Sequence, residues 1–136
     1  MGKYDIAILG AGPGGYTAAV YAAKKGAKVC CIEPLSLGGT CLNRGCIPTK
    51  ALLAGADLWK KINDAECFGI QVEHRKINYA KLVERKDKIV SVQAKGIEFL
   101  FKKYGVDWIH GFGRFASDRE ILVQITDMNG QRTGEE

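Results

Sequence analysis

Two closely spaced cysteines, Cys41 and Cys46, are the residues of this sequence best suited to chemistry. Thiols with four residues between them can close into a disulfide and reopen by thiol–disulfide exchange. Both precede a helix predicted over 51–62, and a helix N-terminus stabilises a thiolate. A zinc site would need a second Cys or His pair. The spacing of the remaining candidates does not supply one: Cys30, Cys31, Cys67, His74 and His110. A redox pair is therefore favoured over a metal site or two buried thiols.

A glycine-rich segment at 10–15, Gly-Ala-Gly-Pro-Gly-Gly, fits the pattern G-x-G-x-x-G. The first glycine of that pattern permits a tight turn, the second lets a pyrophosphate approach the backbone, and the third lets helix and strand pack closely. Free N–H groups at the start of the following helix would face the phosphates. Glu33 follows eighteen residues after Gly15, where an acid accepts ribose hydroxyls. The motif and the acid together predict a dinucleotide site.

A βαβ unit must position these residues. We predict an apolar strand over 3–9, an alanine-rich helix over 16–25 that ends in lysines, and a β-rich strand over 28–33. Strand, helix and strand at this spacing imply parallel pairing through a right-handed crossover.

Two long helices and a small β region follow a glycine-rich link. The apolar periodicity predicts helices over 51–62 and 79–104. Short strands are predicted over 107–110 and 121–126, and Asn129-Gly130 is a turn signal that would open a hairpin. Three other thiols are expected to pack inside strands and helices: Cys30, Cys31 and Cys67.

The length and composition fit one soluble globular domain of 136 residues, 46% hydrophobic and 26% charged. No apolar run approaches a membrane span, and Asp5 stands where a secretory signal would turn apolar. Lysines that give the net charge of +5 alternate with acids along the helices, which is typical of a solvated surface. We therefore predict a cytoplasmic chain with no nucleic-acid or membrane partner.

The segment 38–50, Gly-Gly-Thr-Cys-Leu-Asn-Arg-Gly-Cys-Ile-Pro-Thr-Lys, resembles the redox motif of the class I pyridine nucleotide-disulfide oxidoreductases. Within that family it is most similar to the dihydrolipoamide dehydrogenases, and three residues carry this similarity: Leu42, Ile47 and Thr49. Arg44 departs from the valine common in the family. The resemblance implies an α/β fold in which residues 1–136 form the N-terminal part of a Rossmann-like FAD-binding domain, with a small β-hairpin excursion. The NAD-binding and dimerisation domains would lie outside this chain.

The resemblance also implies which residues meet the cofactor FAD. Glu33 would hold the adenosine ribose, Lys50 would polarise the reactive end of the flavin, and Cys41 and Cys46 would be the catalytic pair. The full set of expected contacts is Gly10, Gly12, Pro13, Gly14, Gly15, Glu33, Pro34, Gly38, Gly39, Thr40, Cys41, Cys46, Lys50 and Gly113. No metal is expected.

The family's reaction implies a division of labour between the two sulfurs. A dihydrolipoamide thiolate would attack the disulfide at Cys41, and Cys46 would pass the electron pair to FAD and onward to NAD. The resemblance also implies the expected partners, which are the lipoyl domain of 2-oxoacid dehydrogenase complexes and a second copy of the longer protein. The family's His–Glu base, which the other subunit supplies, does not occur at its spacing here. Two alternatives stay open: a glutathione-type or mercuric reductase, and a flavin-binding module without catalysis.

Overall fold

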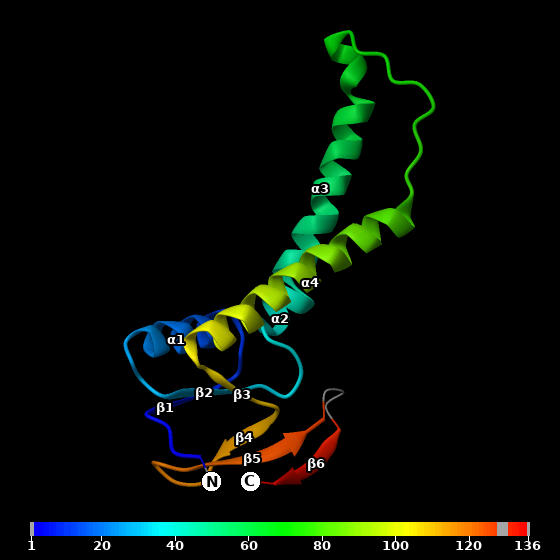
Figure 1. Cartoon of the computed structure of the whole chain (residues 1–136). Coiled ribbons are helices and arrows are strands. Elements are labelled where there is room, and N and C mark those ends of the chain that lie inside the picture. Colours follow the sequence, from blue (N-terminus) through cyan, green and yellow to red (C-terminus); the bar gives the residue numbers. More distant parts are fainter. Residues whose placement is uncertain (1, 128–130, 136) are drawn as a thin grey trace.

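A computed structural model describes residues 2–127 and 131–135, and Figure 1 shows the arrangement of the elements. A parallel sheet lies in the middle, with helices over one face and a small antiparallel sheet on the other side. The predicted turn at Asn129-Gly130 lies outside the described residues. No helix within the described part of the chain is long and apolar enough to cross a membrane.

The parallel sheet contains strands β1 (Ile6–Leu9), β2 (Val29–Ile32) and β3 (Asp107–Ile109), in the order β1-β2-β3. Both strand pairs are parallel. Helix α1 (Pro13–Lys24) joins β1 to β2, which confirms the predicted βαβ unit and the α/β fold class. All four residues of β2 are buried, as expected of a strand with a neighbour on each side.

Helix α1 begins three residues before the predicted start at 16. Glycines have low helix propensity, so the pattern placed the start after Gly14 and Gly15. The structure tolerates them in the first turn because Pro13 occupies the first helical position, where its fixed φ favours the helix and its missing N–H costs nothing.

The predicted glycine-rich link is largely helical. It contains the short helix α2 (Gly39–Asn43) and the first turn of α3 (Cys46–Asn63), which starts five residues before the predicted 51. A 3₁₀ turn, η1 (Ala65–Phe68), follows α3, and an extended segment leads into the long helix α4 (Tyr79–Tyr104). Figure 1 shows the far end of α3 projecting away from the parallel sheet.

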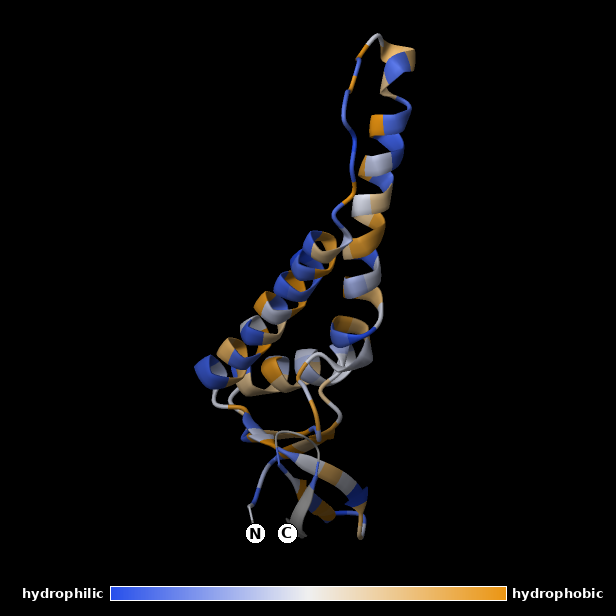
Figure 2. Ribbon diagram, turned by 90° about the vertical axis from the view of Figure 1, so that its right-hand side faces the viewer, coloured by the Kyte–Doolittle hydropathy of each residue, from blue (hydrophilic) through white to orange (hydrophobic). Residues whose placement is uncertain are grey.

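Helix α4 connects this projecting arm to the core. Ile97 and Phe101 are buried in its C-terminal half, in one cluster with Ala19 of α1 and Val29 of β2. Near its N-terminal end, α4 packs on α3 where Gly55 has no side chain: a Cβ there would lie 2.5 Å from Leu82 Cδ1. Figure 2 shows hydrophobic and hydrophilic residues alternating along both helices, as in amphipathic helices.

The antiparallel sheet contains β4 (Gly111–Phe115), β5 (Ile121–Thr126) and β6 (Arg132–Glu135). The predicted strand over 121–126 is confirmed as β5. The expected FAD contact Gly113 is part of β4. Glycines weaken the strand pattern, but a Cβ at Gly111 would lie 2.6 Å from Gln124 O, so close pairing requires glycine here.

The packing prediction for the spare thiols holds for two of the three. Cys30 and Cys31 are buried in β2, whereas Cys67 is exposed in η1, so the prediction for Cys67 is wrong. The Cys67 thiol donates to the carbonyl oxygen of Asp64 at 2.8 Å, a contact within one turn.

Candidate functional site

The glycine-rich loop leaves the carboxyl end of β1 and enters α1. Gly10 has φ +89, a left-handed conformation that favours glycine, and its N–H donates to Ile32 O at 2.8 Å. A Cβ at Gly15 would lie 1.9 Å from Gly10 O, so the third glycine of the motif lets α1 begin directly against the turn. The tight turn and the close packing are those that the motif predicts.

Open space lies in front of the second glycine. A Cβ built on Gly12 or on Gly14 meets nothing within 4 Å, so the fold itself does not require glycine at either position. The N–H groups of Gly14 and Gly15 belong to the first turn of α1 and have no acceptor within the helix, and no side chain in the described part of the chain caps that end. An open backbone surface with free donors fits a phosphate group.

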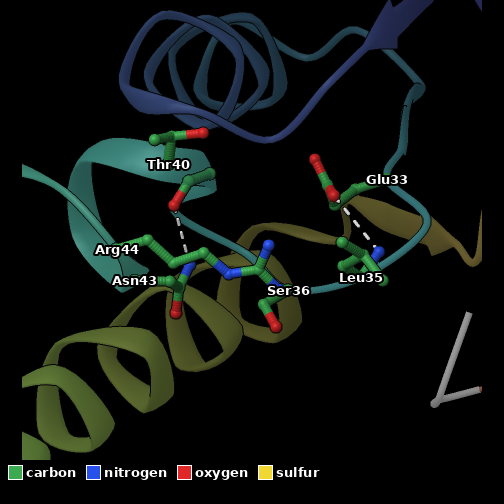
Figure 3. Close-up of a pocket in the computed structure, with 7 residues that line it drawn as sticks. Glu33, Leu35, Ser36, Thr40, Asn43 and Arg44 are labelled. Atoms are coloured by element: carbon green, nitrogen blue, oxygen red, sulfur yellow. Dashed lines mark hydrogen bonds between the residues drawn. The ribbon is translucent and has the colours of Figure 1, made fainter.

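The carboxylate of Glu33 is fixed beside this loop at the carboxyl end of β2. Its Oε2 accepts from Ala11 N at 3.1 Å, and its Oε1 accepts from Leu35 N at 3.2 Å, as Figure 3 shows for the second bond. The indole N–H of Trp108 donates to Glu33 O at 3.2 Å. The side chain is therefore oriented while part of its hydrogen-bonding capacity stays available, as ribose hydroxyls would require.

A second glycine segment packs directly on the first. Gly38 N donates to Ala11 O at 2.8 Å, and a Cβ on Gly39 would lie 2.7 Å from Gly12 Cα. Both Gly38 and Gly39 have positive φ, +97 and +59. The amide of Asn43 donates to Leu37 O and Gly39 O at 3.0 and 2.9 Å, which holds this segment against α2.

A polar pocket of about 170 Å³ lies beside the two glycine segments. Figure 3 shows its walls, which come from the loop after β2 and from α2. The lining residues are Glu33, Leu35, Ser36, Gly39, Thr40, Asn43 and Arg44.

The two candidate redox thiols are neighbours on consecutive helices. Cys41 lies inside α2 and Cys46 is the first residue of α3, so the expectation that both precede the helix is corrected: only Cys41 lies before it. Both are free thiols here. The neighbouring Cys46 side chain raises the pKa of the Cys41 thiol and desolvation adds to the rise, whereas the Cys46 backbone and the Lys50 ammonium lower it. The pair is close enough for the Cys46 side chain to affect the ionisation of the Cys41 thiol.

The other predicted contacts are more scattered. Pro13 is exposed at the start of α1, Lys50 is exposed on α3, and the carbonyl of Pro34 accepts from Thr126 Oγ1 at 3.3 Å. Gly113 lies in β4, where a Cβ would approach Leu9 Cδ2 to 2.3 Å. Packing on β1 therefore explains the glycine at 113 without a ligand.

Sequence reasoning missed the residues that support the site through contacts distant in sequence. Trp108 and Thr126 hold the segment after β2, and neither lies near a motif. The ring of His110 stacks on Trp108 with centroids 3.8 Å apart, and its buried Nδ1 has no hydrogen-bond partner among the residues that the structure describes. Within the described residues, no three His, Cys, Asp or Glu side chains group as metal ligands would.

This fold and this site define a class of protein. The family model described as pyridine nucleotide-disulphide oxidoreductase matches residues 4–129, and the chain belongs to that family. Membership implies FAD and NAD as cofactors, and the open glycine loop with Glu33 beside it fits a dinucleotide.

Relatives in the family carry one recurrent name. The chain is 45% identical over 130 residues to dihydrolipoyl dehydrogenase 3 of Pseudomonas putida, covering 93% of this chain and 28% of the relative. It is 46% identical over 120 residues to the dihydrolipoyl dehydrogenase of Chlamydia trachomatis, with 88% and 26% covered. It is also 46% identical over 125 residues to the dihydrolipoamide dehydrogenase of Chaetomium thermophilum, with 90% and 25% covered. The chain thus spans about a quarter of the length of these curated relatives.

Proposed function

We propose that this chain is the N-terminal part of the FAD-binding domain of a flavoprotein that oxidises dihydrolipoamide. The observation that carries the proposal is the proximity of the Cys41 and Cys46 side chains on the consecutive helices α2 and α3, of which α2 starts beside the dinucleotide loop. The backbone of Gly39, two residues before Cys41, packs on Gly12 of that loop. A cofactor held by the loop would therefore lie near the thiol pair.

The FAD contacts in this proposal follow the geometry of the two glycine segments. Gly12 and Gly14 offer open backbone to the pyrophosphate, Gly14 and Gly15 offer free N–H groups, and Glu33 faces the adenosine ribose. Thr40 and the thiol pair extend the site toward the flavin end, with Lys50 near Cys41. Gly113 is the weakest of the proposed contacts, because packing already accounts for it.

In the proposed reaction, a dihydrolipoamide thiolate attacks Cys41 of the oxidised pair, and the leaving sulfur is that of Cys46. The second substrate thiol then displaces Cys41, which releases oxidised lipoamide and leaves two reduced enzyme thiols. A bound FAD would supply the redox chemistry that links the reduced thiols to NAD. The protein's part is to hold the two sulfurs together and to set which one ionises.

The rest of the machinery is proposed for the longer protein. It comprises a NAD-binding domain, a dimerisation domain that supplies the general base across a homodimer, and docking of a lipoyl domain from a 2-oxoacid dehydrogenase complex. A cytoplasmic location belongs to the same proposal. The names of the relatives favour dihydrolipoamide over the substrates of glutathione-type or mercuric reductases.

The proposal is tested by turnover of the longer protein with dihydrolipoamide and NAD. We expect Cys41→Ser and Cys46→Ser each to abolish turnover while the protein keeps its FAD, and we expect the 136-residue chain alone to be inactive. Oxidised glutathione and mercuric ion, offered with a reduced pyridine nucleotide, are the control substrates. Preference for either control substrate would assign the protein to the glutathione-type or mercuric reductases. Turnover in both serine variants would disprove the redox role of the two cysteines.

A further inference from the structure

Arg44 stands out because it occupies a motif position where the family commonly has valine. Its backbone N–H donates to Thr40 O at 2.9 Å, which places the residue at the end of α2. Its side chain is exposed and, within the described residues, forms no salt bridge. Figure 3 shows the guanidinium extending toward Ser36, with Glu33 beyond it across the pocket.

The side chain of Arg44 forms part of the wall of the pocket. It lines the pocket together with Glu33, Ser36 and Thr40, whereas the cation that lowers the pKa of Cys41 is Lys50. A carboxylate and a guanidinium on one pocket, with two hydroxyls between them, match a ligand that carries both a diol and an anionic group.

The charge balance of the site points to the same ligand. A pyrophosphate on the glycine loop would carry two negative charges, and the Glu33 carboxylate is a third negative group nearby. The N-terminus of α1 contributes roughly half a positive charge, and neither Pro13 nor the glycines after it is basic. Arg44 is the cation in the described lining of the pocket.

We propose that Arg44 and Glu33 form opposite walls of one ribose–phosphate subsite, in which the Arg44 guanidinium binds a phosphate of the adenylate half of the dinucleotide. The inference rests on the proposed FAD site and adds a charged contact to it. Guanidinium groups bind phosphate through paired hydrogen bonds, and such charge-assisted bonds are stronger than neutral ones.

The test measures dissociation constants on the apo form of the longer protein. We expect Arg44→Gln to weaken FAD binding about tenfold at low salt, the effect of losing one charge-assisted hydrogen bond, and the difference from the unsubstituted protein to shrink at high salt. Arg119→Gln is the matched control, because it removes the same charge from a side chain that is 91% exposed between β4 and β5.

Competing nucleotides identify the group that Arg44 binds. Arg44→Gln should weaken competition by ADP and leave competition by adenosine unchanged, whereas Glu33→Gln should weaken both, because both carry the ribose diol. Equal FAD affinity in Arg44→Gln and Arg119→Gln, or unchanged competition by ADP, would overturn the subsite. If the unsubstituted protein does not bind FAD, the proposed function itself, on which the subsite rests, would be overturned instead.

Discussion

The glycines of the first loop serve two different purposes at the scale of single residues. Gly10 and Gly15 are required by the fold, through a positive φ and through contact between helix and turn. Gly12 and Gly14 face open space, so their lack of a side chain has no internal explanation. A ligand that approaches the backbone would supply one.

This division predicts opposite outcomes for two substitutions in the longer protein. Gly12→Val should leave the thermal unfolding midpoint of the apoprotein nearly unchanged and yield colourless protein, because the new side chain obstructs only the pyrophosphate. Gly15→Ala should lower the midpoint, because its Cβ would lie 1.9 Å from Gly10 O. Yellow, fully loaded Gly12→Val protein would contradict the assignment. Glu33→Ala should weaken FAD binding less severely than Gly12→Val does.

The thiol pair predicts an order of alkylation. In the reduced 136-residue chain, limiting iodoacetamide should label Cys46 before Cys41, because Cys46 is exposed and its proximity raises the pKa of Cys41. Peptide mapping by mass spectrometry gives the order. In the FAD-loaded longer protein we expect the reverse order, because Cys46, the sulfur expected to pass electrons to FAD, would be covered by the flavin. An order that is the same in both samples would contradict that placement.

The buried thiol of Cys31 makes the folded state sensitive to alkali. Burial raises its pKa to about 12 from the ordinary 9.0, and the charge of Glu33 adds to the rise. At a pH between these two pKa values, the Cys31 thiol keeps its proton in the folded chain and has released it in the unfolded chain. Stability is therefore full below about pH 9 and declines above it, by at most about 1.4 kcal/mol per pH unit for one proton.

Urea denaturation from neutral to alkaline pH tests this dependence. Cys31→Val should flatten the alkaline decline, whereas Cys67→Ala, which alters an exposed thiol, should leave it unchanged. If the free energy of unfolding falls equally steeply with pH in Cys31→Val and in the unsubstituted chain, groups other than Cys31 cause the alkaline decline.

At the scale of elements, sequence patterns identified the helices and strands better than their ends. Periodicity and composition found β1, α1 and β2, since a buried strand and an alanine-rich helix leave strong local signals. The start of α3 was missed because Pro48 and Gly45 read as part of a link, although proline is tolerated in the first turn of a helix. The packing of Gly39 on Gly12 has no local signal, because it joins two loops only in the folded chain.

The first turn of α4 offers a test of an element boundary. The side chain of Asn78 accepts from Lys81 N at 3.1 Å and caps the helix. Asn78→Ala should therefore lower the free energy of unfolding by about 1 kcal/mol, whereas Asn78→Asp should preserve it. Chemical denaturation of both variants measures the difference. Equal stability of the Ala and Asp variants would show that the cap contributes nothing to global stability.

The whole molecule is organised around the carboxyl ends of its parallel strands. Gly10 and Glu33 follow β1 and β2 there, and the thiol pair lies on the helices that come next in the chain. Sequence motifs predicted this set of residues, because phosphate loops and redox cysteines have characteristic spacings. They could not predict the arm formed by α3 and α4 or the support from Trp108, which depend on contacts distant in sequence.

The central claim is that Cys41 and Cys46 form a redox pair with Cys46 against the flavin. The most direct measurement is the absorption spectrum of the FAD-loaded longer protein after two-electron reduction. A Cys46 thiolate beside oxidised flavin should give a long-wavelength band, which Cys46→Ser should abolish and Cys41→Ser should keep. A band that survives in Cys46→Ser, or that disappears only in Cys41→Ser, would contradict the account.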